Sequence, residues 1–190
     1  APGTNTNVIQ YIEMSTTGNS LDFGDIMSAL RGQGVANSTT RAIIAGGDAS
    51  PSGGKVSSVE QVTIASKGNS KDFGELTAKR RVENQNISSS TRGVFAAEGW
   101  GNGMDIIDYM TIASEGNAQD FGDLVAVSYL PATCSSHTRG IIGGGTPSSL
   151  KTVQYVTIAS AGNAIHFGDL SEDRYAHSAV SDSHGGLGGF

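Results

Sequence analysis

The histidines, acids and serines near the C-terminus are the residues best suited to catalysis. His177 and His184 flank Asp182 among several serines, which are the residue types of a Ser-His-Asp hydrolase. Such a triad is defined by its geometry and an oxyanion hole, and closeness in sequence provides neither. The GxSxG, HExxH and Walker patterns do not occur. We therefore interpret these histidines, with His137 and His166, as ordinary strand or loop residues, and we predict that the protein is not an enzyme.

Acids at repeated positions could instead bind a metal. An acid follows each Phe-Gly pair, at Asp25, Glu75, Asp123 and Asp169. The residue before each of these phenylalanines is Asp22, Asp72, Asp120 or His166. Several carboxylates around a central axis would suit Ca²⁺, which prefers oxygen ligands. His166 breaks the set with a poor calcium ligand, so we favour a structural role and predict no metal and no other cofactor.

The structural alternative is an ion pair in each repeat. A second repeated position carries Arg41, Arg92, Arg139 and His184. Both this position and the one before Phe change to histidine in the same repeat. We hypothesise that the aspartates pair with these arginines, and that His166 and His184 replace the pair. A partly buried bidentate pair would set the spacing of neighbouring sheets. Pairing of the arginines with the acid after Phe-Gly is left open.

One aromatic side chain is a candidate for ligand recognition. Trp100 is the only tryptophan, and it lies in the segment EGWGNGMD with Asn102 and Asp105. An exposed indole can stack on a sugar ring while neighbouring amide and carboxylate groups bind its hydroxyls. The alternative is a Trp folded over the edge of a sheet. The segments that differ most between repeats are those around Trp100 and its counterparts, and variable loops on a rigid scaffold commonly carry recognition.

These residues are positioned by an internal repeat. The phrase GNSLDFGD recurs as GNSKDFGE, GNAQDFGD and GNAIHFGD, with its first glycine at Gly18, Gly68, Gly116 and Gly162. Seven residues before each of these glycines stand Tyr11, Gln61, Tyr109 and Tyr155. A second block, such as STRGVFAAEG or HTRGIIGGG, follows each phrase. We interpret Gly-Asn as a turn, the Phe as an anchor between neighbouring sheets, and the Gly after it as a point of close backbone approach.

The repeats predict an all-β fold. Each unit of about 48 residues contains short apolar segments with alternating or continuous hydrophobicity, separated by glycine-rich turns, and helical periodicity is absent. Four strands in such a unit match the size of a propeller blade. We therefore predict a single domain over residues 1–190, a four-bladed β-propeller.

The chain ends predict how the ring closes. The C-terminal GGLGGF corresponds to a diglycine strand, and the N-terminal APGTNTNVIQYIEM corresponds to the segment that follows it in the other repeats. The N-terminal strand would thus complete the last blade and protect two strand edges. A longer parent chain, or several chains in a larger ring, would give the same pattern.

The order of apolar strand, diglycine and tyrosine resembles the kelch class of propeller repeats, although the usual kelch tryptophan is missing. The pattern of residues 107–124 and 138–145 looks more specifically like repeats of bacteriophage tail-fibre or virion proteins, especially marine ones. This resemblance implies a non-enzymatic role in a virion. We expect attachment, for example to a host glycan, with a purely structural or assembly role as the alternative.

The amino-acid composition restricts the classes of partner that the protein is expected to bind. The net charge is −6 and no Lys/Arg run occurs, so we expect no nucleic-acid partner. No apolar run approaches the roughly 20 residues of a membrane helix, so we expect no membrane partner. A single cysteine, Cys134, permits no internal disulfide. We expect a virion or extracellular location, with virion or fibre subunits or a surface glycan as partners, and leave a homo-oligomer open.

Overall fold

The computed structural model describes residues 5–49, 54–83, 86–147 and 151–181. All regular secondary structure in these ranges is β-strand, arranged in four sheets, so the predicted all-β class is confirmed. No helix in the described ranges is long and apolar enough to cross a membrane.

Two of the sheets contain exactly one four-stranded unit each, and we call them sheets II and IV. Sheet II has the order β3-β4-β5-β6, and its strands are β3 (Gly34–Asn37), β4 (Arg41–Ala45), β5 (Ser58–Thr63) and β6 (Lys71–Glu75). Sheet IV has the order β11-β12-β14-β15, and its strands are β11 (Ala132–Ser135), β12 (Arg139–Gly143), β14 (Thr152–Thr157) and β15 (Ile165–Asp169). All pairings within them are antiparallel.

Sheet III repeats this unit and carries one additional short strand. Its order is β13-β10-β9-β8-β7, with β7 (Asn86–Ser88), β8 (Arg92–Ala96), β9 (Met104–Thr111), β10 (Gln119–Tyr129) and the added β13 (Thr146–Pro147). Sheet I is a hairpin of β1 (Thr6–Tyr11) and β2 (Leu21–Leu30). These two strands correspond to the outer half of the other units. The predicted partner for β1, the C-terminal diglycine strand, lies outside the described residues.

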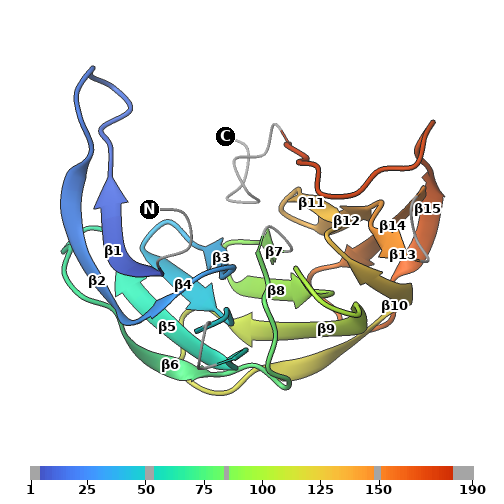
Figure 1. Ribbon diagram of the computed structural model, residues 1–190, viewed down its shortest axis with the longest axis horizontal. Coiled ribbons are helices and arrows are strands. Elements are labelled where there is room, and N and C mark those ends of the chain that lie inside the picture. The colour runs from blue at the N-terminus through green and yellow to red at the C-terminus, as the bar shows by residue number, and fades with distance from the viewer. Residues whose placement is uncertain (1–4, 50–53, 84–85, 148–150, 182–190) are drawn as a thin grey trace.

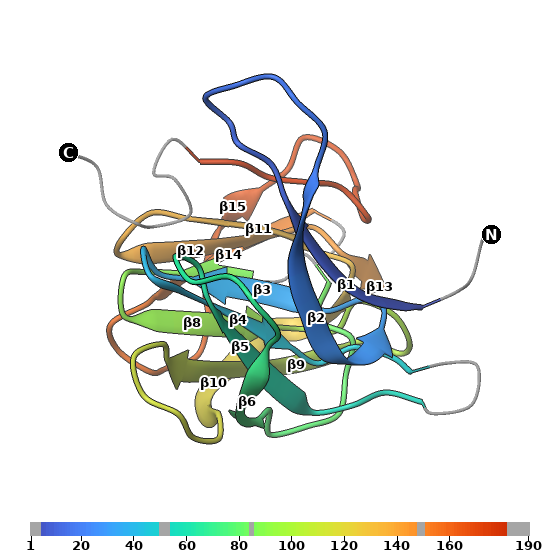
Figure 2. The same cartoon turned by 90° about the vertical axis from the view of Figure 1, so that its left-hand side faces the viewer.

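The sheets follow one another round a curve in chain order, from β1 and β2 to β15 (Figure 1). The first strands of the units, β3, β7 and β11, lie towards the inside of the curve, and β2, β6, β10 and β15 lie on the outside. The loop between β1 and β2 projects beyond the other sheets (Figure 2). The N-terminal hairpin and the last sheet thus stand at the two ends of the curve.

The hydrophobic core lies between neighbouring sheets. One cluster joins sheet II to sheet III and includes Ile43 and Phe73 from one sheet with Phe95 and Ile112 from the other. A second cluster joins sheet III to sheet IV in the same way. Strands such as β8 are buried on both faces, which explains their continuous apolar sequences.

Neighbouring sheets are also joined by four recurring hydrogen bonds, which we call the junction bonds. The Gly and the residue two after it in each Gly-Asn turn donate their N–H groups to the Phe and acid carbonyls of the preceding sheet. The acid N–H donates to the Asn Oδ1, and the N–H two residues after the acid donates to a buried polar side chain. Between sheets I and II these bonds are Gly68 N to Phe23 O (2.7 Å), Ser70 N to Asp25 O (2.8 Å), Asp25 N to Asn69 Oδ1 (3.0 Å) and Met27 N to Glu60 Oε2 (2.9 Å).

The same four bonds recur at the next two junctions. Sheets II and III are joined by Gly116 N to Phe73 O, Ala118 N to Glu75 O, Glu75 N to Asn117 Oδ1 and Thr77 N to Asp108 Oδ2, at 2.8–3.1 Å. Sheets III and IV are joined by Gly162 N to Phe121 O, Ala164 N to Asp123 O, Asp123 N to Asn163 Oδ1 and Val125 N to Gln154 Oε1, at 2.6–3.1 Å. Two successive copies of the repeated phrase therefore supply most of the groups that form one junction.

The glycines after Phe23, Phe73 and Phe121 are required by this contact, whereas a Cβ on Gly168 would meet nothing within 4 Å. A Cβ on Gly24, Gly74 or Gly122 would lie 2.3–2.6 Å from backbone atoms of the next sheet's Gly, and the three φ angles are +141° to +150°. Both facts exclude a side chain. The predicted close approach is thus confirmed. The predicted Phe anchor holds for Phe73 and Phe121, each 2% exposed.

Candidate functional site

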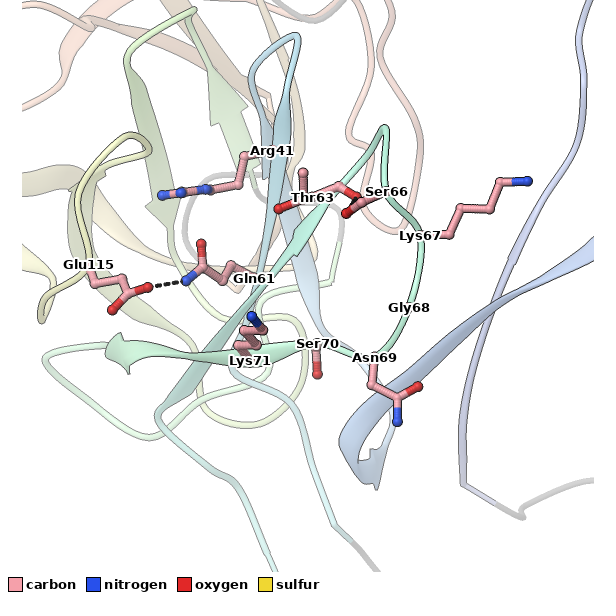
Figure 3. Close-up of a pocket in the computed structure, with 10 residues that line it drawn as sticks. All are labelled: Arg41, Gln61, Thr63, Ser66, Lys67, Gly68, Asn69, Ser70, Lys71 and Glu115. Carbon is pink, nitrogen blue, oxygen red and sulfur yellow. Dashed lines mark hydrogen bonds between the residues drawn. The ribbon is translucent and has the colours of Figure 1, made fainter.

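A cavity of about 530 Å³ opens on sheet II beside the junction with sheet III. Figure 3 shows its lining. Arg41 comes from β4, Gln61 and Thr63 come from β5, and residues 66–71 form the following turn and the start of β6. Glu115 reaches the cavity from the turn after β9 of sheet III.

The turn that forms one wall is held by local geometry and by the junction bonds. Ser66 N donates to Thr63 O at 3.3 Å, and Lys67 adopts a positive φ of +52°. Gly68 and Asn69 then bind sheet I through the junction bonds described above. The wall is therefore positioned by the same residues that connect the sheets.

A smaller cavity of about 210 Å³ occupies the equivalent position on sheet III. Its lining includes Arg92 at the position of Arg41 and Tyr109 at the position of Gln61. The Arg92 guanidinium lies 4.6 Å from the centre of the Tyr109 ring, and this ring meets Phe121 edge-to-face at 5.8 Å. A tyrosine ring therefore takes up space that remains open on sheet II.

The polar groups of the larger cavity have defined partners. Arg41 Nη1 donates to Ile112 O at 2.9 Å, which fixes the guanidinium against sheet III. The buried Gln61 donates through Nε2 to Glu115 Oε1 at 2.5 Å. Lys67 extends away from the cavity (Figure 3), with its ammonium over the ring of Tyr11. Besides Lys67, the charged residues of the lining are Arg41, Lys71 and Glu115, and the two cations suit a ligand with a hydrogen-bond acceptor.

Another cavity, of about 270 Å³, lies among the inner strands β3, β7 and β11. Its lining carries no charged side chain and consists of Asn37, Asn86, Ser88, Thr133, Cys134, Ser135 and the segment Ala179–Ser181, which adds two apolar residues. Burial raises the pKa of the Cys134 thiol above its usual range. Within the described ranges, no group of three His, Cys, Asp or Glu side chains could hold a metal ion. The repeated acids do not line this cavity.

The structure places the predicted recognition residues away from these cavities. Trp100 is 59% exposed, in the segment between β8 and β9, and the Arg81 guanidinium lies 5.9 Å from its ring centre. Asn102 is exposed and Asp105 is half-buried on β9. None of the three lines the cavities described above. Glycan binding through them stays a prediction.

The predicted Asp–Arg pairs need a correction. The ion pairs of the described residues include none between Asp22, Asp72 or Asp120 and the repeated arginines, and these aspartates are exposed. Arg41 and Arg92 instead donate to the carbonyl oxygens of Ile112 and Ile158 in the next sheet. The arginines therefore link sheets as predicted, but a carbonyl dipole replaces the carboxylate. Arg139 lies 4.6 Å from the ring centre of Tyr155. His166 contacts Asp169 at 3.3 Å, and His184 lies outside the described residues.

Sequence reasoning did not single out two functional features. Gln61 was visible as the one exception in a column of tyrosines, and that exception marks the larger cavity. The ion pair of Arg80 with Asp108 is fully buried, with Nη1 to Oδ2 at 2.8 Å. Arg80 stands seven residues after its Phe, where the last repeat has Arg174 but the other two repeats have Leu30 and Ser128, so no pattern common to all repeats indicated it.

Comparison of the chain with protein-family models gives no match, and comparison with curated protein sequences gives none either. The functional argument therefore depends on the geometry of this chain and on its internal repeats.

Proposed function

We propose that the protein is a four-bladed β-propeller, closed by a fourth junction between sheet IV and sheet I, and that it acts as a non-enzymatic attachment module of a virion or cell surface. The observation that carries the ring is the triple recurrence of the junction bonds. A fourth set of the same donors and acceptors stands at the two ends of the curve.

Every donor and acceptor of the fourth set has a counterpart of the same type in the sequence of sheets IV and I. Sheet IV offers Phe167 O, Asp169 O, Asp169 N and Ser171 N as the counterparts of the groups that bind the next sheet elsewhere. Sheet I offers Gly18 N, Ser20 N, Asn19 Oδ1 and Gln10 Oε1 as their partners. Ser20 Oγ already donates to Gln10 Oε1, as Ser70 Oγ donates to Glu60 Oε2 at the first junction.

The exposed surface at both ends favours closure. Phe167 is 60% exposed and Met14 is 93% exposed, whereas the equivalent Phe121 and Ile112 are 2% and 1% exposed. Full burial of one such side chain contributes about 1.5–3 kcal/mol. A junction formed here would bury both residues. It would also place the carbonyl oxygen of Met14 where Arg139 can donate a hydrogen bond to it, as Arg92 donates to Ile158 O.

The inner side of the curve already continues into a fourth position. Ser181 Oγ donates to Ser135 O at 2.6 Å, and Ser135 Oγ donates to Ser88 O at 3.2 Å. Asn37 N in turn donates to Ser88 Oγ at 3.1 Å. These contacts link one residue from each of the four repeats around the inner cavity, which supports a ring of four units.

Attachment is supported by where the repeats differ. The junctions make a rigid scaffold, while the connections after the diglycine strands vary in length and sequence. One of them presents Trp100, whose exposed indole is a suitable platform for a sugar ring. The resemblance to virion repeats agrees with this role.

Binding of the purified protein to a panel of glycans tests the attachment role. We expect Trp100→Ala to abolish glycan binding without changing the melting temperature, because the side chain is mostly exposed. Lys151→Ala is a suitable control, since this exposed residue lies on another part of the chain, directly before β14. Unchanged glycan binding by the Trp100 variant, or no binding by the native chain to any glycan, would contradict the assignment.

An assembly role is the alternative, and the same exposed junction favours it. Gly18–Ser20 of one copy could bind Phe167–Asp169 of a second copy, so that copies add head to tail. Sedimentation velocity over a range of concentrations separates the two: a monomer of 19.5 kDa throughout supports closure within one chain. Growth of the particle with concentration would favour assembly.

A further inference from the structure

The cavity on sheet II has the cationic wall of an aromatic-ring site but lacks the ring. On sheet III, the Tyr109 ring lies between the Arg92 guanidinium and the edge of Phe121. On sheet IV, Tyr155 lies in the same way, 4.6 Å from Arg139 and 6.1 Å from Phe167. The repeats therefore show what this position accommodates: a planar ring with a cation on one face.

The cationic wall is present on sheet II. Arg41 Nη1 donates to Ile112 O at 2.9 Å, and Arg92 Nη1 donates to Ile158 O at 3.0 Å, so the two guanidinium groups are fixed by the same bond. Phe73, the counterpart of Phe121, lies behind this wall, with the Arg41 guanidinium 5.9 Å from the centre of its ring. The cationic face that contacts Tyr109 thus has a direct counterpart.

The residue at the ring position is held to one side. Gln61 donates to Glu115 Oε1 at 2.5 Å, and Figure 3 shows this amide directed to Glu115, with Arg41 on another side of the cavity. On sheet IV, the position of Glu115 is occupied by Ala161, which has no hydrogen-bonding side chain. The exchange of Tyr for Gln is therefore accompanied by an acid that binds the glutamine. The result is a cavity of about 530 Å³ in place of one of about 210 Å³.

The hydroxyl end of the missing ring also has a counterpart. Tyr109 Oη donates to Gln119 Oε1 at 2.5 Å, and Gln119 is its partner on the neighbouring strand. The equivalent partner of Gln61 is Lys71, which lines the cavity. An ammonium group at this end would donate to a phenol oxygen and would stabilise a phenolate.

We infer that the cavity binds a phenol ring, supplied either by a free phenolic compound or by a tyrosine side chain of a partner. The ring stacks on Arg41 and directs its hydroxyl to Lys71, and both residues line the cavity. Cation–π contact with Arg41 and a hydrogen bond from the Lys71 ammonium supply the attraction. The site lies away from the open fourth junction and from Trp100, so it depends neither on ring closure nor on glycan attachment.

The test is a titration of the ¹⁵N-labelled protein, followed by NMR, with p-cresol and with N-acetyltyrosinamide. We expect saturable shifts confined to residues 41, 61–71 and 115. Tighter binding of N-acetyltyrosinamide would assign the site to a tyrosine of a partner, and equal or tighter binding of p-cresol would assign it to a small phenol. Absence of saturable binding for both probes would overturn the inference.

Two substitutions make the test specific. Gln61→Tyr places the ring of the other repeats in the cavity, so we expect affinity for both probes to fall at least tenfold while the protein stays folded. Lys71→Ala is expected to weaken N-acetyltyrosinamide more than N-acetylphenylalaninamide, with Lys79→Ala as the control. Unchanged affinity in the Gln61→Tyr variant would overturn the assignment of the site, whatever the other variants show.

Discussion

Replacement of the buried acid at the second junction should be strongly destabilising. Asp108 and Arg80 are both 0% exposed at their side chains, and they are joined at 2.8 Å. Asp108 also accepts hydrogen bonds from Thr77 Oγ1 at 2.6 Å and from Thr77 N at 3.1 Å. In Asp108→Asn, the charge of Arg80 stays buried without a counter-ion, although the new amide can still accept from Arg80 and Thr77 N and donate to the Thr77 hydroxyl.

The expected loss follows from these contacts. Removal of one partner from a buried ion pair costs about 3–5 kcal/mol. For a chain of this size, each kcal/mol lowers the melting temperature by about 2–4 °C, so we expect a decrease of about 6–20 °C. Urea denaturation followed by circular dichroism gives the free energy of unfolding, and calorimetry gives the melting temperature.

Matched variants separate burial from charge. Asp22→Asn removes an exposed acid and should change the free energy of unfolding by less than about 0.5 kcal/mol. The double variant Arg80→Met/Asp108→Leu removes both charges and should recover much of the loss, because a buried pair can often be replaced by apolar residues at little cost. A stability of Asp108→Asn within 1 kcal/mol of the native chain would refute the reasoning.

Three further predictions concern the junctions and the inner cavity. Gly74→Ala should cost about 2–4 kcal/mol in the free energy of unfolding, because its Cβ would meet the backbone of the next sheet and its φ is positive; Gly168→Ala should cost as much in a closed ring and almost nothing in an open one. Arg92→Ala should cost about 1–3 kcal/mol through the lost bond to the next sheet and the lost cation–π contact, against almost none for Lys79→Ala. The raised pKa of Cys134 should leave less thiolate at pH 8 than an exposed thiol has, so iodoacetamide should react slowly until the pH is raised further or the protein is unfolded.

Three results would contradict these predictions. A normal melting temperature for Gly74→Ala would show that the close approach is not required. Equal losses in the free energy of unfolding for the Arg92 and Lys79 variants would show that Arg92 does not stabilise the junction. Reaction of Cys134 in the folded protein as fast as that of a free thiol at pH 8 would contradict its burial.

The sequence was sufficient to predict the strands and the roles of the recurring phrase. Phe73 and Gly74 could be assigned because the contacts they make are repeated, and a repeated contact leaves a repeated residue. The Asp–Arg pairing was wrong for a physical reason. The acceptor for Arg92 is a backbone carbonyl, which every residue possesses, so no side chain in the sequence identifies it. The coincident change to histidine involves His184, which lies outside the described residues, so that part of the hypothesis stays a prediction.

In the sequence, the candidate site was indicated only by one residue that departs from the repeat. Gln61 interrupts a column of tyrosines, but the sequence does not show that Arg41 keeps its bond to the next sheet when the ring is absent. That information comes from the bond of Arg41 to Ile112 and from the cavity itself. Arg80 and Asp108 could not be paired from sequence, because Arg80 recurs only as Arg174 and the position of Asp108 carries Gln10, Glu60 and Gln154 in the other repeats.

Amide hydrogen exchange at the fourth junction tests the central claim most directly. In a closed ring, the N–H groups of Gly18, Ser20 and Asp169 are bonded as those of Gly68 and Ser70 are at the first junction, so we predict similar protection factors, independent of protein concentration. Gly116 and Gly162 serve as further internal references. Exchange of Gly18, Ser20 and Asp169 at the rates of an unfolded chain, while the three reference junctions stay protected, would contradict closure of the four-bladed ring.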